Sequence, residues 1–304
     1  MDHSPLRLGI DLGGTKIEAA LLDASGAIIW RKRITSPRND YGATLAALKT
    51  LVVAARNDIA AAQTCTIGIG IPGSLSPGDG RVRNANSTWL NGQPLKRDLE
   101  QLLGQSVAIA NDANCLAVSE FTDGAARDAQ SVFAVILGTG VGGAHVINGE
   151  LVVGANGIAG EWGHVPLPWM TAEEFDHPPC WCGGSGCVET FLSGPALVQE
   201  FNTSAAESVQ SVQEILRLAE SGHATAIALM HRFHDRLARA LAMVINIIDP
   251  EVIVLGGGLS NLPSIYTEIP KRWGRWIFSD VPAVTRIVPA LHGDSSGVRG
   301  AAWL

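Results

Sequence analysis

The 304-residue sequence lacks basic runs and carries a formal net charge of −7. Because proteins that bind nucleic acids usually present a basic surface, this balance argues against a nucleic-acid partner. No apolar run approaches the roughly 20 residues that a helix needs to span a bilayer, which argues against a membrane protein. Residues 1–6 lack the long apolar stretch of a secretion signal. We therefore expect a cytoplasmic protein.

The sequence also lacks charged linkers and low-complexity tracts that would divide it. Its length suits two ordinary domains, and its apolar content of 46% is enough for two cores. The 34 glycines are spread through short motifs at the ends of expected strands. This distribution is typical of backbone that approaches a ligand closely.

Cysteine is scarce, and three of the five cysteines form a C-x-C-x4-C pattern at Cys180, Cys182 and Cys187. His164 precedes them in a G-E-W-G-H segment, and Cys3His is a recurring ligand set for structural zinc. A catalytic zinc would keep only three protein ligands, so the fourth favours a structural metal. The alternatives are reduced buried thiols beside an unrelated histidine, or a disulfide, which a reducing compartment disfavours. Cys65 and Cys115 are predicted to be small core residues.

A glycine turn follows the first expected strand, at residues 7–10, and leads into a second strand at 17–22. Its sequence is D-L-G-G-T-K, residues 11–16. Such a turn offers backbone N–H groups to phosphate oxygens, together with the Thr15 hydroxyl and the Lys16 cation. Asp11, at the strand end, is a candidate to hold magnesium through water. The alternative is an ordinary hairpin turn.

A second turn repeats this architecture. A strand at 132–137 leads into G-T-G-V-G-G, residues 138–143, and then into a strand at 144–147. Two similar phosphate-type loops in one chain indicate an internal duplication. Further along, a strand at 251–255 runs into three glycines, residues 256–258, where a flat ligand could lie against the backbone.

Two polar segments are candidates for substrate binding. The loop at 84–92 contains Asn86 and Trp89, which suit sugar hydroxyls and the apolar face of a sugar, although an asparagine-rich turn is the alternative. A strand at 106–110 ends in N-D-A-N, residues 111–114. Asp112 would point beyond the carboxyl end of a strand, where ligands gather in open α/β sheets; alternatively, it caps the next helix.

The remaining elements complete an α/β pattern. Apolar spacing and breaker residues predict helices at 41–62, 115–121, 189–201, 208–220, 225–248, near 263–276 and after 297. Further strands are expected at 26–34, 66–71 and near 285–289.

Taken together, the motifs resemble the sugar kinases of the ROK family, within the actin-like ATPase superfamily. The matching segments are D-L-G-G-T-K at 11–16, N-D-A-N at 111–114, L-G-T-G-V-G-G at 137–143, G-E-W-G-H at 160–164, C-W-C-G-G-S-G-C-V-E-T at 180–190 and L-G-G-G at 255–258. The resemblance implies an α/β fold of two ribonuclease-H-like domains with a cleft between them. We expect a small domain at 1–118, completed by a terminal helix within 291–304, and a large domain with the zinc site at 119–290.

The resemblance also implies roles for individual residues. Asp112 would act as general base, and the sugar would be bound by Asn86, Asn111, Asp112, Glu161, His164 and Glu189. ATP phosphates would lie against Gly13, Gly14, Thr15 and Lys16 and against Gly138, Thr139 and Gly140, and the adenosine would face Gly256, Gly257 and Gly258. Magnesium would accompany ATP near Asp11, and His164, Cys180, Cys182 and Cys187 would bind zinc. The family also suggests a homodimer.

The expected chemistry is modest. Phosphoryl transfer depends on positioning and charge neutralisation, so glycine loops, a metal and one carboxylate can suffice. An aspartate with the ordinary pKa of about 3.9 is already ionised at neutral pH. The structural zinc would fix Glu161, His164 and Glu189 near the sugar.

The expected substrate is D-fructose, phosphorylated to fructose 6-phosphate, with mannose or glucose as further substrates. Segments 85–94, 163–170 and 292–304 look most like bacterial fructokinase, also called mannokinase. Within the family, the alternatives are N-acetylglucosamine kinase and glucokinase. A ROK repressor is disfavoured because the first phosphate loop begins at Asp11 and leaves no room for a helix-turn-helix. A dinucleotide-dependent oxidoreductase would need G-x-G-x-x-G followed by a helix.

Overall fold

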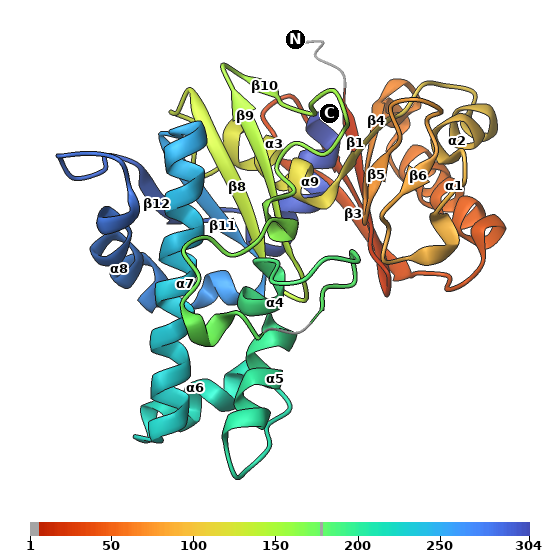
Figure 1. Cartoon of the computed structure of the whole chain (residues 1–304). Helices are drawn as coiled ribbons and strands as arrows, with labels where there is room; N and C mark the ends of the chain where they lie inside the picture. Colours follow the sequence, from red (N-terminus) through yellow and green to blue (C-terminus); the bar gives the residue numbers. More distant parts are fainter. Residues whose placement is uncertain (1–5, 177–178) are drawn as a thin grey trace. The chain divides into compact units, whose positions relative to one another are not determined.

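The computed structural model describes residues 6–176 and 179–304 and contains two five-stranded sheets (Figure 1). Residues 1–5, which bear on the expected lack of a secretion signal, lie outside the described part. The first sheet has the order β3-β2-β1-β4-β7. Its strands are β1 (Arg7–Leu12), β2 (Lys16–Leu22), β3 (Ile28–Thr35), β4 (Thr66–Ile71) and β7 (Ala108–Asn111).

The second sheet has the order β10-β9-β8-β11-β12. Its strands are β8 (Ser131–Leu137), β9 (Val141–Ile147), β10 (Glu150–Leu151), β11 (Val252–Gly256) and β12 (Arg286–Pro289). In both sheets the central strand pairs in parallel with the fourth, and the fourth with the fifth. On the other side of the central strand, the first and second strands of each sheet are antiparallel to each other: β3 to β2, and β10 to β9. The sheets thus share the repeated architecture that the two glycine turns predict, and the α/β prediction is confirmed.

The chain divides into two compact units, described separately below. Unit 1 comprises residues 1–128, 144–159 and 291–304, and unit 2 comprises residues 129–143 and 160–290. The predicted domain boundaries at 118 and 290 remain a prediction.

The helices of unit 1 are α1 (Tyr41–Asp58), α2 (Leu95–Leu103), α3 (Asp112–Thr122) and α9 (Ser296–Trp303). The predicted helix at 41–62 ends four residues early because Ile59 is extended, and a 3-10 turn, η1 (Ala60–Thr64), follows. Helix α2 and three short strands of unit 1 were not predicted: β5 (Ser74–Leu75), β6 (Val82–Arg83) and β10.

The helices of unit 2 are α4 (Glu189–Leu192), α5 (Gly194–Ser204), α6 (Val212–Glu220), α7 (Ala224–Ile248) and α8 (Pro263–Arg272). The single helix predicted at 189–201 is wrong. Ser193 is extended and caps α5 by accepting a hydrogen bond from the Ala196 N–H at 3.3 Å, so the chain turns between α4 and α5. Within residues 6–176 and 179–304, no helix is long and apolar enough to cross a membrane.

Glycines set the packing of unit 1. Alternate residues of β1 and β4 face opposite sides of the sheet, and their leucines and isoleucines share one core with apolar residues of α1 and α2. On the other face, a Cβ atom at Gly9 would lie 2.0 Å from the Val298 carbonyl oxygen, and one at Gly68 would lie 1.8 Å from that of Ala301. Helix α9 therefore lies directly on the strand backbone, which only glycine permits.

A buried charge network holds α7 in unit 2. Glu174 accepts hydrogen bonds from Arg236 Nε at 2.8 Å and from Arg239 Nη2 at 2.7 Å, and all three side chains are nearly inaccessible to solvent. Arg236 also pairs with Glu200, and Arg239 with Asp235. Burial alone would raise the pKa of Glu174, but the hydrogen bonds from Arg239 and Arg236 outweigh it and lower the pKa to about 2.

We predict that Glu174→Gln lowers the free energy of unfolding by about 3 kcal/mol, because it removes the buried carboxylate that Arg236 and Arg239 share and leaves each arginine only its pair with Glu200 or Asp235. The folded pKa lies below the unfolded value of about 4.3. The contribution is therefore complete above pH 4.3 and is lost as the pH falls toward 2. Chemical unfolding of both proteins across this range measures it. Glu268→Gln, in an exposed ion pair on α8, is the control and should change stability little; an equal effect of the two substitutions would contradict the prediction.

Candidate active site and metal centre

A cavity of about 610 Å³ in unit 1 lies at the carboxyl ends of β1 and β4. It brings together seven residues predicted from the sequence: Asp11, Gly13, Gly14, Thr15, Asn86, Trp89 and Asp112. The turn after β1 is closed by a hydrogen bond from the Gly13 N–H to the Lys16 carbonyl at 3.0 Å. Residues from three separate segments of sequence thus share one concave surface.

Asp112 and Asn111 divide their tasks at the start of α3. The Asn111 side chain caps the helix by accepting a hydrogen bond from the Asn114 N–H at 2.6 Å. Asp112 is the first residue of the helix and accepts from the Ala113 N–H at 2.8 Å. The alternative role of Asp112 was to cap this helix, and Asn111 provides that cap instead. Asp112 remains solvent-accessible and faces the cavity, whereas Asn111 does not line it.

The two carboxylates in this cavity raise the electrostatic cost of ionisation. Burial, the negative charge of Asp112 and that of Glu18 raise the pKa of Asp11 to about 6. Surrounding protein also raises the pKa of Asp112 above its ordinary value. The expectation that Asp112 has the ordinary aspartate pKa is therefore wrong, because the pKa is raised.

Sequence analysis missed several residues of the cavity. Arg38, Asn39 and Ser87 line it together with the residues above. Arg38 brings a cation to a cavity that holds two carboxylates. Asn39 has a φ of 58°, a left-handed conformation that asparagine tolerates. The Asn39-Asp40 pair before α1 was therefore a sequence signal for a turn at this place. Lys16, predicted to contact phosphate, is exposed and does not line this cavity.

A second cavity, of about 820 Å³, lies within unit 2. Gly138, Thr139 and Gly258 line it, together with residues of α5 and the start of α6. The Gly194 N–H, at the start of α5, donates to the Gly138 carbonyl at 2.8 Å. Sequence analysis missed the polar residues of its wall, among them Gln199, Asn202, Gln210 and Ser211. Gln199 and Asn202 lie on α5, and Gln210 and Ser211 lie just before α6; polar residues at such positions usually indicate a solvated face or a helix cap.

The other predicted glycines of unit 2 have different surroundings. Gly256 ends β11 and is buried. Gly257 has a φ of 83°, and a Cβ atom there would lie 2.4 Å from the Leu137 carbonyl oxygen, so glycine is required for the two strand ends to meet. A Cβ atom at Gly140 would lie 2.7 Å from a carboxylate oxygen of Glu189. Neither Gly140, Gly256 nor Gly257 lines the second cavity.

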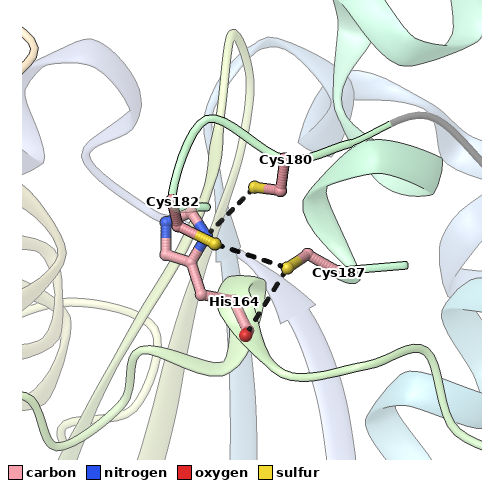
Figure 2. Close-up of side chains that lie close together, drawn as sticks. All are labelled: His164, Cys180, Cys182 and Cys187. Atoms are coloured by element: carbon pink, nitrogen blue, oxygen red, sulfur yellow. Dashed lines mark hydrogen bonds between the residues drawn. The ribbon is translucent and has the colours of Figure 1, made fainter. Parts of the chain in front are cut away.

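The four predicted zinc ligands converge in unit 2 (Figure 2). Their ligand atoms lie within 4.8 Å of one another. The Cys180 sulfur is 3.5 Å from His164 Nδ1, and the sulfurs of Cys182 and Cys187 are 3.7 Å apart. In a tetrahedral site with Zn–S bonds near 2.3 Å, neighbouring sulfurs lie roughly 3.8 Å apart. The three thiols and the imidazole therefore fit a structural zinc ion, which would hold together the loop at 180–187 and the 3-10 turn η3 (Trp162–His164).

The remaining predicted sugar ligands flank this cluster. Glu161 precedes η3. Glu189 begins α4, and its carboxylate accepts hydrogen bonds from the Val141 N–H at 2.9 Å and from Trp181 Nε1 at 2.7 Å. Sequence analysis did not single out Trp181, which lies between two zinc ligands. Cys65 and Cys115 are buried in unit 1, as predicted.

Comparisons with known proteins place the fold and the motifs in a family. The sequence profile of the ROK family matches residues 7–304. The chain is 41% identical over 300 residues to N-acetyl-D-glucosamine kinase of Yersinia pseudotuberculosis, covering 97% of each protein. Its structure is similar to that of a ROK hexokinase from Thermus thermophilus, with a TM-score of 0.83, 29% identity and coverage of 98% and 97%. A ROK glucokinase from Streptomyces griseus, solved with glucose and AMPPNP, gives a TM-score of 0.77, 27% identity and 98% coverage of both chains.

The chain belongs to the ROK family, and the predicted fold is confirmed. The expectation of a fructokinase is wrong. Curated relatives that match nearly the whole chain at 41% identity are N-acetyl-D-glucosamine kinases. The expectation depended on three short segments, whereas the relatives match over 300 residues.

We predict that Cys182→Ser lowers zinc content well below one ion per chain, because a hydroxyl is a poor replacement for a thiolate at zinc. Metal analysis of the purified protein and thermal unfolding measure the effect, and we expect a lower melting temperature. The control is Cys65→Ser, which removes a thiol of unit 1 and should leave metal content unchanged. Full zinc content in Cys182→Ser would contradict the proposed ligand set.

Proposed function

We propose that this protein is an ATP-dependent sugar kinase with N-acetyl-D-glucosamine as its substrate. The observation that carries the proposal is the cavity of unit 1, where an accessible carboxylate, a glycine turn and polar side chains meet. The Yersinia pseudotuberculosis relative supports the choice of sugar. The Streptomyces griseus relative, solved with glucose and AMPPNP, supports a hexose and an adenine nucleotide as the two ligands.

The proposed reaction uses Asp112 as general base. Its carboxylate takes the proton of a sugar hydroxyl while that oxygen forms a bond to the γ-phosphorus of ATP. The bond from the γ-phosphorus to the bridging oxygen breaks, and ADP leaves. Because Asn111 caps α3, the Asp112 carboxylate is available at the cavity surface for this proton transfer. The raised pKa brings the base closer to neutral pH, where general bases work best.

The nucleotide would lie against glycine-lined backbone. We propose that Gly13, Gly14 and Thr15 and the turn at Gly138–Gly140 offer N–H groups to the phosphates, and that the 820 Å³ cavity at Gly258 takes the adenosine. Magnesium, when bound with ATP, would neutralise phosphate charge, and Asp11 is its proposed protein neighbour. The Arg38 side chain, which lines the same cavity as Asp11, would add a positive charge.

The sugar would also contact Asn86, Asn111, Glu161, His164 and Glu189. In unit 2, Glu161 precedes η3, His164 ends it and is one of the four cluster residues, and Glu189 begins α4. A zinc ion on His164, Cys180, Cys182 and Cys187 would order both segments, and its role is structural. The homodimer expected from the resemblance remains a prediction.

We predict that Asp112→Asn lowers kcat by about 10²–10⁴-fold with a smaller change in KM, because the amide cannot accept the proton. A coupled assay of ADP release with ATP and magnesium tests N-acetyl-D-glucosamine, glucose, mannose and fructose. We expect the highest kcat/KM for N-acetyl-D-glucosamine. A higher value for another hexose would overturn the choice of substrate and leave the kinase intact. If no sugar is phosphorylated, the proposed function fails.

The pH dependence gives an independent test. Both cavity carboxyls have raised pKa values, about 6 for Asp11, and the reaction needs ionised carboxylates. We therefore predict that kcat/KM for the sugar falls as the pH is lowered through about 6. Thermal unfolding over the same range separates this loss from unfolding. A rate that stays constant down to pH 4.5 would contradict the assignment.

A further inference from the structure

Glu189 connects two loops of unit 2 through its two carboxylate oxygens. One oxygen accepts the Val141 N–H at 2.9 Å, directly after the glycine turn of β8 and β9. The other accepts Trp181 Nε1 at 2.7 Å, from the cysteine loop. A Cβ atom at Gly140 would lie 2.7 Å from the carboxylate, so a side chain there would displace it. Glu189 is therefore held from both sides.

Trp181 owes its own position to the metal cluster. It lies between Cys180 and Cys182 in sequence, and its ring packs edge-on against the His164 imidazole, with centroids 4.9 Å apart and planes at 90°. Its side chain is nonetheless mostly exposed, at 68%. An exposed indole contributes little to a core, so packing alone does not account for a tryptophan here. The directional contacts to His164 and Glu189 do.

We propose that Trp181 is a positioning residue, which fixes the carboxylate of Glu189 for sugar binding and transmits the order of the cysteine loop to it. This inference rests on the proposed function, in which Glu189 contacts the sugar. A carboxylate held by two donors keeps its orientation, and its remaining lone pairs are available to sugar hydroxyls. Without the indole N–H, the carboxylate keeps one anchor and rotates more freely.

The test compares Trp181→Phe, which keeps an aromatic ring and removes the N–H donor, with wild type. Because hydrogen bonds to charged groups are among the stronger ones, we expect KM for the sugar to rise about tenfold, with kcat and KM for ATP within about twofold. Zinc content should stay near that of wild type. The matched control is Trp169→Phe, another partly exposed tryptophan of unit 2, which stacks on Trp276 and should leave KM unchanged.

A double-mutant cycle with Glu189→Gln shows whether Trp181 acts through Glu189. The glutamine has one acceptor oxygen for two donors, so the Trp181→Phe effect should shrink from about tenfold to less than about threefold in that background. Equal effects in both backgrounds, an unchanged KM in Trp181→Phe, or a loss of zinc in that variant would each overturn the inference. If wild type phosphorylates no sugar, the proposed function itself has failed, which the first assay shows before any variant is made.

Discussion

The close approach of α9 to the first sheet is the constraint on which unit 1 depends. Gly9 and Gly68 leave no side chains between the strands and the helix, so the backbone of α9 contacts the backbone of β1 and β4. The opposite face of the same strands carries leucine and isoleucine into the core under α1 and α2. With both faces covered, the strands are buried, and polar groups gather at their carboxyl ends. Asp11 and Asp112 line the same cavity at these strand ends, where ligands gather in open α/β sheets.

Much of this arrangement could be predicted from the sequence. Alternating or continuous apolar runs identified the central strands, and the glycine turns at 11–16 and 138–143 showed that two similar sheets follow one another. The four metal ligands could be named because their side-chain chemistry and spacing are restrictive. Asp112 could be named because it directly follows a strand. These signals are local, and the structure brings the corresponding residues together.

Other features could not be predicted because they depend on contacts distant in sequence. Arg38 and Ser87 line the unit 1 cavity because the fold brings their segments to it, and neither residue lies in a recognisable motif. The break at Ser193 separates α4 from α5 although the apolar spacing continues across it. The raised pKa of Asp11 arises from burial and from Asp112, which is about 100 residues further along the chain. The substrate was misjudged because three short segments were weighted above the whole chain, and sugar preference depends on a few side chains around the ring.

The place of α9 in unit 1 also bears on how the protein is made. The residues of β1 and β4 emerge from the ribosome long before residues 296–303 are synthesised. The face of these strands that carries Gly9 and Gly68 therefore remains uncovered during most of translation. Unit 1 therefore cannot complete its fold before residues 296–303 have been synthesised, whereas all residues of unit 2 precede α9. A nascent chain in this state exposes sheet backbone to water and to other chains. Synthesis and docking of α9 close this surface.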